Sequence, residues 1–413
     1  MPSNAASFTA SHTGLLDQFL HSRRYTLDLI SGLSPEDCQA QSMNDASPAK
    51  WHLAHVTWFY EVMVLKAAEP DFQYWNTEFA VLFNSYYNGV GDKHPRHQRG
   101  LLTRPTLLEV LEWRSNIEAR ITALLETNAS PELAALIEIG IHHEQQHQEL
   151  LLTDIQHLFS CNSLLPAYSP KKTVLSNQSI PTAWLPGISG LCEVGFDGNG
   201  FYFDNEGPRH TVFLQPHAIS NHLVTNGQWL AFIESGAYTD PRWWLDAAWF
   251  WLQTERISAP LYWSTDHDNK RWCFTLQGNQ PLDLNAPVSN ISYFEADAYA
   301  RWAGQNLDDH KGARLPTEFE WESFARAHSQ SDVDLFGKVW QWTSSNYSPY
   351  PGYQPWGGIA GEYNGKFMVN QMVLRGSSSY TSPDHARVSY RNFFPTHARW
   401  QMTGLRLAKD QAR

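Results

Sequence analysis

The first 160 residues contain helix-start signals that constrain the fold of this chain more than any other feature. A Ser or Thr side chain can accept a hydrogen bond from a free amide in the first turn of a helix, and Pro suits that turn because it has no amide to leave unpaired. Such signals stand at Ser47-Pro48, at Thr106 with Glu109, and at Ser130-Pro131. Apolar residues recur at intervals of three and four after each signal, and also over residues 11–31. Four long helices, and therefore a helical bundle, are predicted.

The length of 413 residues predicts a second domain, because single hydrophobic cores stop growing well below that size. After residue 161 the pattern changes to a segment rich in Pro and Ser, followed by short mixed segments separated by Gly, Asn, Asp and Pro. Only two clear helices stand out there, at 225–236 and 292–306. We therefore expect an α+β chain with a bundle at 1–165, a linker at 166–185 and an irregular domain at 186–413.

Charge and composition exclude several classes of partner. The net charge is −12, and no cluster of Lys and Arg forms a footprint for nucleic acid. The first 30 residues lack the pattern of a secretory signal, and no apolar run approaches the roughly 18 residues of a membrane span. The four cysteines are scattered without a metal-binding or disulfide pattern. We expect a cytoplasmic protein that binds neither nucleic acid nor membrane, and homo-oligomerisation stays open.

The stretch "IHHEQQHQELLLTDIQH", residues 141–157, contains four histidines. Positions four apart share one face of a helix, so His143 and His147 can point at the same place, whereas His142 lies about 100° away. For this pair alone, a solvent-facing polar helix is the more frequent explanation. A second histidine-bearing helix, "WHLAHVTWFYE", offers His52 or His55 from among aromatic residues and shifts the balance towards a metal site.

Three neutral imidazoles without a thiolate suit Zn, Fe, Cu or Ni, and the ligand type does not choose among them. Such a set leaves coordination positions open for substrate and for water or dioxygen, so the site would be catalytic. Glu149 lies two residues after His147 and points elsewhere on the helix, so it could orient a histidine of another helix but not share a metal with His147.

A set of motifs along nearly the whole chain resembles the ergothioneine-biosynthesis sulfoxide synthases. The motifs are "WHLAHVTWFYE", "NSYYNGVGDKHPRHQRGLLTRP", "HHEQQHQE", "GFYFDNEGPRH", "RLPTEFEWE", "VWQWTSS", "RGSSSY" and "YRNFFPTHARW". The resemblance implies a DinB-like four-helix bundle joined to a domain of the formylglycine-generating-enzyme type, which has a C-type-lectin-like fold. It also implies a non-haem Fe(II) enzyme that uses O₂ to join a thiol sulfur to C2 of the imidazole of N-α-trimethylhistidine (hercynine), giving a sulfoxide.

Carried over by position, the resemblance also implies roles for single residues. The iron ligands would be His55, His143 and His147, which leaves His52 as a neighbour of the ligands or a packing residue. Gln146 would face the hercynine imidazole, and the paired arginines would hold the carboxylate of the thiol substrate. The implied substrate-binding residues are Arg96, Arg99, Gln146, Asn392, Phe393 and Phe394.

A tyrosine is implied as the proton donor near bound oxygen, and two places in the chain offer one. One branch of the family has it in an "NSYY" element of the bundle, here Tyr86 and Tyr87. Another branch has it in the C-terminal domain, where "YPGY" supplies Tyr350 and Tyr353. The surrounding loop matches the first branch, so Tyr86 and Tyr87 are the predicted catalytic residues.

Two departures from related proteins refine the expected reaction. Catalysts that make formylglycine use two cysteines, but "RGSSSY" has serine where one is expected, so sulfatase activation is not expected. Relatives that use γ-glutamylcysteine have aspartate at the place of Phe394, so free cysteine is the expected thiol. The alternatives are γ-glutamylcysteine, histidine or a selenium donor as substrate, a metal-dependent thiol transferase, and a binding module in which the histidines serve only structure.

Overall fold

The computed structural model describes residues 12–127, 129–169, 181–198, 200–328 and 333–411. The chain folds as two units. Residues Met1–Ser163 together with Gly357–Glu362 form the first, and residues Leu164–Trp356 together with Tyr363–Arg413 form the second. Residues 170–180 of the predicted linker lie outside the described residues. No described helix combines the length and the apolar composition that a membrane crossing requires.

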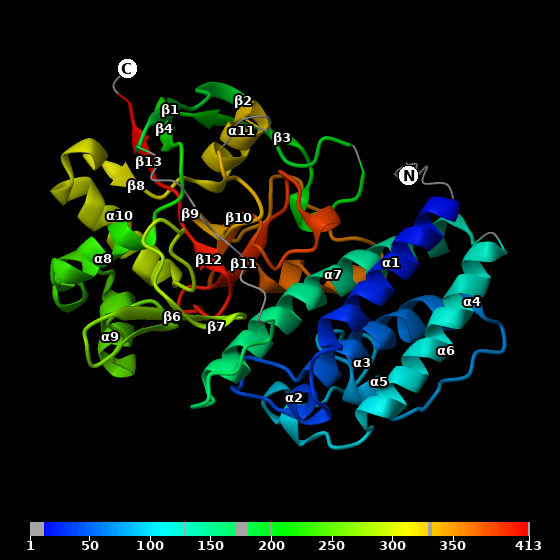
Figure 1. Cartoon of the computed structure of the whole chain (residues 1–413). Coiled ribbons are helices and arrows are strands. Elements are labelled where there is room, and N and C mark those ends of the chain that lie inside the picture. Colours follow the sequence, from blue (N-terminus) through cyan, green and yellow to red (C-terminus); the bar gives the residue numbers. More distant parts are fainter. Residues whose placement is uncertain (1–11, 128, 170–180, 199, 329–332, 412–413) are drawn as a thin grey trace. The chain divides into compact units, whose positions relative to one another are not determined.

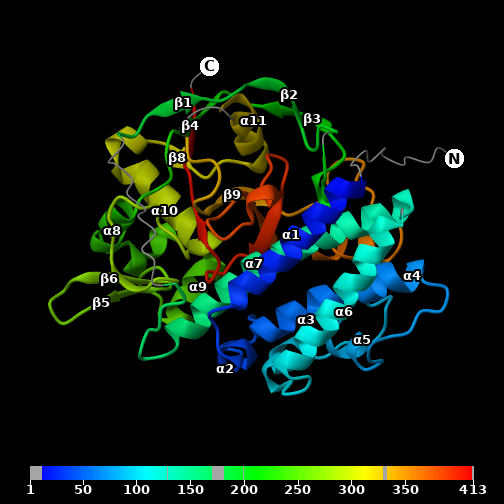
Figure 2. The same cartoon turned by 45° about the vertical axis from the view of Figure 1, so that its right-hand side comes forward.

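The first unit is a bundle of four long helical segments within the described residues. They are α1 (His12–Ile30), α3 (Ala49–Phe59), α6 (Leu107–Glu126) and α7 (Pro131–Ser160). Helices α1 and α3 each pack against both α6 and α7 (Figure 1). Figure 2 shows α1 running alongside α7, and α3 alongside α6. Shorter elements occupy the connections, namely α2 (Pro35–Gln39), α4 (Lys66–Ala68), α5 (Phe79–Leu82) and the 3₁₀ helix η2 (Arg96–Leu101).

Two of the three predicted helix starts have the expected caps. The side chain of Thr106 accepts a hydrogen bond from the amide of Glu109, whose carboxylate accepts one from the amide of Thr106. Ser130 caps α7 through the amide of Leu133. The third helix, α3, does begin after Pro48, but the predicted cap is wrong because no side chain caps this helix. The amide of Ser47 instead donates to Asp154, and its hydroxyl accepts from Arg99. The sequence alone did not show these contacts.

The helix predicted to begin at Ser47-Pro48 changes its winding part of the way along. A π-helix, η1 (Tyr60–Leu65), follows α3 and leads into α4. Tyr60 is fully buried in this π-helix and packs beside Gly140 of α7, where an added Cβ would lie 2.5 Å from the tyrosine ring. Glycine is therefore needed at this close approach of the two helices.

Six residues of the C-terminal half, Gly357–Glu362, belong to the bundle unit. The carboxylate of Glu362 accepts hydrogen bonds from the amides of Asn88 (3.0 Å) and Gly89 (2.9 Å). A Cβ at Gly89 would lie 2.5 Å from the Glu362 carboxylate, so a larger residue there would displace this carboxylate. Nothing in the local sequence pattern of either segment predicted the pairing.

Among the described residues, the second unit contains four α-helices and small sheets. The helices are α8 (Asn226–Glu234), α9 (Asp246–Glu255), α10 (Tyr293–Asn306) and α11 (Glu318–His328). The sequence predicted α8 and α10 but missed α9 and α11. A signal for α11 existed in "TEFE", because the side chain of Thr317 accepts a hydrogen bond from the amide of Glu320 and the Glu320 carboxylate accepts one from the amide of Thr317.

The strands of this unit form four sheets among the described residues. One has the order β1 (Trp184–Pro186), β4 (His217–Ser220), β13 (Ala408–Asp410), β8 (Ala313–Arg314), and another β11 (Asn392–Pro395), β10 (Gln371–Gly376), β9 (Trp340–Asn346), β12 (Thr403–Gly404). The hairpin β2 (Gly190–Val194) and β3 (His210–Leu214) and the meander β5 (Trp263–Thr265), β6 (Arg271–Thr275), β7 (Gly278–Pro281) complete the set. Helix α11 contributes Trp321 and Phe324 to a core that also holds Ile219 and Ala408 of the first sheet.

Candidate metal centre

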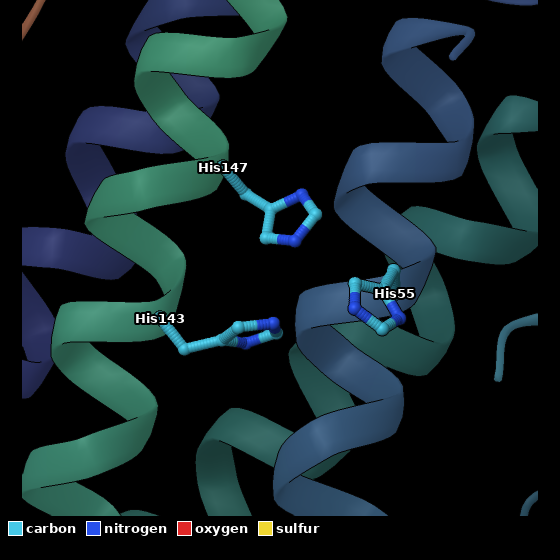
Figure 3. A group of neighbouring side chains, drawn as sticks. All are labelled: His55, His143 and His147. Carbon is cyan, nitrogen blue, oxygen red and sulfur yellow. The ribbon is translucent and has the colours of Figure 1, made fainter. Parts of the chain in front are cut away.

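Three buried histidine side chains converge between α3 and α7. His55 lies on α3, and His143 and His147 lie one turn apart on α7. Figure 3 shows the three rings pointing into the space between the two helices. One nitrogen atom of each ring lies within 4.8 Å of the corresponding atoms of the other two. The three residues are exposed by only 0, 5 and 6%, so bulk water has little access to these nitrogens.

The ring of His55 is fixed in both orientation and proton position. Its Nδ1–H donates to the carbonyl oxygen of Phe83 at 2.6 Å, so its Nε2 carries the lone pair. That Nε2 is buried and has no hydrogen-bond partner. The ring is stacked between Trp51 (4.6 Å between centroids, 14° between planes) and Trp58 (5.5 Å, 15°). His55 therefore presents one nitrogen to the centre and cannot turn away from it.

The two histidines of α7 are held differently from His55. The Nδ1 atom of His147 lies 2.8 Å from Nδ1 of His52, which leaves the Nε2 atom of His147 for the centre. The Nδ1 atom of His143 is buried without a hydrogen-bond partner, and its ring packs on Phe59 at 4.8 Å between centroids.

The electrostatics of the site favour neutral imidazoles. Burial is the largest cause that lowers the pKa of each histidine, and it takes the pKa of His143 to about 4. The pKa values of His55 and His147 lie well below the ordinary value, because His143 lowers them further. Neutral rings keep the lone pairs that a metal ion needs.

These residues fit a bound transition-metal ion. Buried polar atoms without partners are rare because they cost free energy, and coordination would remove that cost for His55 Nε2 and His143 Nδ1. Three nitrogen donors with no thiolate among them suit Zn, Fe, Cu or Ni. The arrangement can therefore hold one such ion and leave positions for other ligands.

The two predicted catalytic tyrosines differ in their surroundings. Tyr87 is buried and its ring lies 5.6 Å from that of Trp58. Burial raises the pKa of Tyr87, and neighbouring Tyr86 and Glu362 raise it further. For Tyr86 burial also acts to raise the pKa, but the positive charges of Arg96 and Arg99 outweigh it and lower the pKa below the ordinary value of 10.

The two predicted substrate-binding arginines occupy different environments on η2. Arg99 is buried and its guanidinium carbon lies 3.4 Å from the centre of the Trp51 ring. It donates hydrogen bonds to the hydroxyls of Ser47 and Ser85, both at 2.9 Å. Arg96 is exposed and donates to the carbonyl oxygen of Asp45. Of the two arginines, only Arg99 therefore packs on Trp51, which is one of the two tryptophans stacked on His55.

The other predicted substrate-binding residues lie on two elements. Gln146, partly buried, precedes His147 on α7. Asn392, Phe393 and Phe394 lie on β11 in the second unit. The side-chain oxygen of Asn392 accepts from the amide of Phe393 at 2.9 Å, and the Phe393 ring stacks on Tyr347 at 4.0 Å. Phe394 pairs with Met372 of β10.

The alternative tyrosines of the second unit are engaged with carboxylates. Tyr350 donates to Glu318 at 3.1 Å and accepts from Arg375 at 2.8 Å. Tyr353 donates to Asp204 at 3.1 Å. Burial is the largest cause that raises the pKa of both phenols. Proton donation by either would require breaking these bonds.

Comparison with known proteins matches each of the two units to a protein family. The family model described as a sulfatase-modifying factor enzyme 1-like domain matches residues 182–333 and 332–411, and the DinB superfamily model matches residues 18–151. The hercynine oxygenase of Mycobacterium tuberculosis is 30% identical over 420 residues, which cover 88% of this chain and 91% of that protein. The chain belongs to the hercynine oxygenase family.

Two further relatives agree with membership of the hercynine oxygenase family. The hercynine oxygenase of Mycolicibacterium thermoresistibile is 29% identical over 451 residues, covering 96% of this chain and 94% of that protein. The ergothioneine biosynthesis protein 1 of Schizosaccharomyces pombe is 26% identical over 243 residues, covering 51% of this chain and 28% of that protein. The expected DinB-like bundle and formylglycine-generating-enzyme type domain, and with them the α+β class, are confirmed.

In this member of the hercynine oxygenase family, sequence reasoning missed Asp154 as a neighbour of the centre. Its carboxylate lies 3.0 Å from Nε2 of His52 and 2.8 Å from the amide nitrogen of Ser47. A signal existed, because Asp154 follows His147 by seven residues and therefore lies on nearly the same helix face. The stacking of His55 between Trp51 and Trp58 was also missed, although the positions three and four residues from His55 carry the aromatic residues that make it.

Proposed function

We propose that this chain is a non-haem Fe(II)- and O₂-dependent sulfoxide synthase of ergothioneine biosynthesis. It would join the sulfur of cysteine to C2 of the imidazole of hercynine. The observation that carries the proposal is the group of three converging, buried histidines in a chain that aligns with hercynine oxygenases over most of both lengths.

The proposed reaction is balanced with one molecule of dioxygen. A thiol S–H bond and the imidazole C2–H bond are broken, and a C–S bond and an S–O bond are formed. One oxygen atom remains on sulfur, and the other leaves as water with the two hydrogens. A bound Fe(II) ion would supply the redox chemistry with O₂, which the closed-shell Zn²⁺ ion cannot do. This requirement for a redox-active metal supports iron over zinc at the three histidines.

The residues of the chain would bind and orient the two substrates. Gln146 lies beside His147 on α7 and could meet the hercynine imidazole with its amide. Arg99 could exchange its hydroxyl partners for the carboxylate of cysteine, because a guanidinium binds an anionic carboxylate through two parallel hydrogen bonds more strongly than it binds two neutral hydroxyls. Phe394 offers no hydrogen bond to the additional charged group of γ-glutamylcysteine, which supports cysteine as the thiol.

Tyr86 is the tyrosine that we propose as the proton donor. Its pKa is lowered by two guanidinium groups, whereas that of Tyr87 is raised. A more acidic phenol gives up its proton more readily, so Tyr86 suits general acid catalysis better than its neighbour.

The test is oxygen consumption by the full chain after anaerobic loading with Fe(II). Hercynine and cysteine are supplied separately and then together, with γ-glutamylcysteine and histidine as competing substrates. We expect rapid consumption only with hercynine and cysteine together, and one O₂ consumed for each sulfoxide formed. Product formation without oxygen would instead identify a thiol transferase and overturn the proposal.

Matched histidine variants connect this activity to the centre. His143→Ala removes one of the three nitrogens and should abolish Fe(II) binding and oxygen consumption. His142→Ala changes the neighbouring residue, which faces away from the pair on α7, and should leave both nearly unchanged. Full activity in His143→Ala with only a loss of stability would show that the histidines are structural.

A further inference from the structure

The side chain of His52 joins the candidate metal centre to a buried carboxylate. His52 lies on α3, three residues before His55, and is 3% exposed. Its Nε2 is 3.0 Å from Oδ2 of Asp154, and its Nδ1 is 2.8 Å from Nδ1 of His147. Asp154 is 7% exposed and lies seven residues after His147 on α7. The three side chains therefore form a buried, hydrogen-bonded row that ends at the centre.

The positions of the protons in this row follow from donor and acceptor rules. An aspartate carboxylate accepts hydrogen bonds only, so Nε2 of His52 must carry a proton. A neutral His52 then has a lone pair at Nδ1, and His147 must donate its Nδ1–H to it. The lone pair of His147 is thereby placed on Nε2, the nitrogen that remains for a metal ion. If His52 were replaced by an apolar residue, nothing would select this tautomer of His147.

The same carboxylate oxygen also holds the two histidine-bearing helices together. Oδ2 of Asp154 accepts a hydrogen bond from the amide of Ser47 at 2.8 Å, just before α3 begins at Ala49. Asp154 belongs to α7, which carries His143 and His147, whereas α3 carries His55. One buried group therefore sets both the tautomer of a ligand and the spacing of the helices that carry the ligands.

His55 shows that a fixed tautomer is shared by two of the three histidines of the centre. Its Nδ1–H is held by the carbonyl oxygen of Phe83, as that of His147 is held by His52. Hydrogen bonds to the outer nitrogen of a ligand histidine fix its orientation and raise its basicity, and their loss typically weakens metal binding about 10- to 100-fold.

We propose that Asp154 and His52 are positioning residues that preset His147 for metal binding. The inference rests on the proposed metal centre and adds to it a buried Asp–His pair outside the three ligands. As positioning residues, the two side chains act through His147 and through the amide of Ser47.

The test measures binding of Co(II) to the metal-free full chain, because Co(II) reports its ligands through visible absorption and does not require oxygen. His52→Phe keeps an aromatic ring but cannot accept the proton of His147. His52→Gln offers an amide oxygen in its place, and Asp154→Asn keeps an oxygen for Ser47 and His52 but removes the charge. The matched control for the loss of charge is Glu118→Gln, which removes an acidic group from α6.

We expect His52→Phe to bind Co(II) about 10- to 100-fold more weakly than the parent and to change its visible absorption. His52→Gln should bind Co(II) more tightly than His52→Phe. The Co(II) affinity of Asp154→Asn should lie between those of the parent and His52→Phe. The control should match the parent. A purely structural role would lower the melting temperature of the metal-free variants without this ordering of affinities.

Equal Co(II) affinity of His52→Phe, Asp154→Asn and the control would overturn the inference. If His52→Phe fails to fold in the metal-free state, the test rests on Asp154→Asn and His52→Gln. Co(II) affinity equal to that of the parent in both variants would then overturn the inference. Absence of Co(II) binding by the parent would instead overturn the proposed metal centre, so the two failures can be told apart.

Discussion

Tyr86 and Tyr87 are adjacent in the chain, yet they face opposite electrostatic conditions. Guanidinium groups of η2 lower the pKa of Tyr86, whereas burial and neighbouring negative charge raise that of Tyr87. Tyr87 packs against Trp58, which in turn packs against His55. We therefore expect Tyr86 to act in proton transfer, and Tyr87 to hold Trp58 in place against His55.

Phenylalanine variants separate these two roles. Tyr86→Phe removes an acid that steers oxygen chemistry towards C–S bond formation, so the ratio of sulfoxide to cysteine sulfinate should fall on the order of a hundredfold. Tyr87→Phe keeps the ring against Trp58 and serves as the matched control, with a ratio close to that of the parent. Quantifying both products by mass spectrometry checks this prediction. An unchanged ratio in Tyr86→Phe would exclude Tyr86 as the donor.

At the scale of secondary-structure elements, a buried ion network joins three helices of the bundle. Glu144 of α7 pairs with Arg23 of α1 (3.1 Å) and with Arg114 of α6, and it accepts a hydrogen bond from Thr26 at 2.6 Å. Glu144 follows His143 directly, but one residue turns a helix by about 100°, so its side chain faces α1 and α6 instead of α3. The residues of α7 around position 143 thus serve the metal centre on one face and helix packing on another.

Glu144→Gln should destabilise the bundle in a pH-dependent way. Burial acts to raise the pKa of Glu144, but Arg114 and Arg23 outweigh it and lower the pKa to about 2 from the ordinary 4.5. A lowered pKa in the folded state stabilises the fold above about pH 4.5, and this contribution is lost as the pH falls towards 2. At pH 7 the variant leaves two buried guanidinium groups without their carboxylate, which should cost about 3 to 5 kcal/mol.

Urea unfolding of the metal-free protein measures this effect at neutral pH and below about pH 4. The difference between parent and variant should shrink as the pH falls. Glu118→Gln is the control, because Glu118 is one third exposed and lies 3.6 Å from Arg23, so its loss should cost less than about 1 kcal/mol. A difference that stays constant with pH would contradict the assignment to this carboxylate.

At the scale of the whole molecule, a formylglycine-generating type of fold is joined to a metal-binding type of bundle. The second unit has no cysteine in "RGSSSY", where Ser377 accepts a hydrogen bond from the amide of Gly337 at 2.8 Å. Cys192 and Cys273 lie in different sheets, on β2 and β6. The fold is therefore present without the thiol pair that oxidation of a substrate cysteine would need.

Incubation of the metal-loaded protein with a peptide carrying a sulfatase cysteine motif, O₂ and a thiol should give no formylglycine. Mass spectrometry of the peptide checks this, because conversion of the cysteine side chain changes the peptide mass. Sulfoxide formation by the same preparation from hercynine and cysteine shows that it is active. Formylglycine above the level of a protein-free control would contradict the prediction.

The sequence alone determined the parts of the molecule that depend on near neighbours. Helix periodicity and the caps at Thr106 and Ser130 predicted α6 and α7, because these signals act within one or two turns. The spacing of His143 and His147 placed both on one face for the same reason. The pattern of motifs then predicted the two kinds of domain and the family, which comparison confirmed.

Only the tertiary structure decided how distant residues cooperate. The contact of Asp154 with His52 joins positions 102 residues apart, and Glu362 joins the bundle from 273 residues beyond Gly89. Ser47 looked like a helix cap but instead links Asp154 and Arg99. Such contacts depend on which helix faces pack together, and a local pattern carries no record of that. The free nitrogens of His55 and His147, and with them the capacity to bind a metal, were therefore fixed by packing and not by spacing.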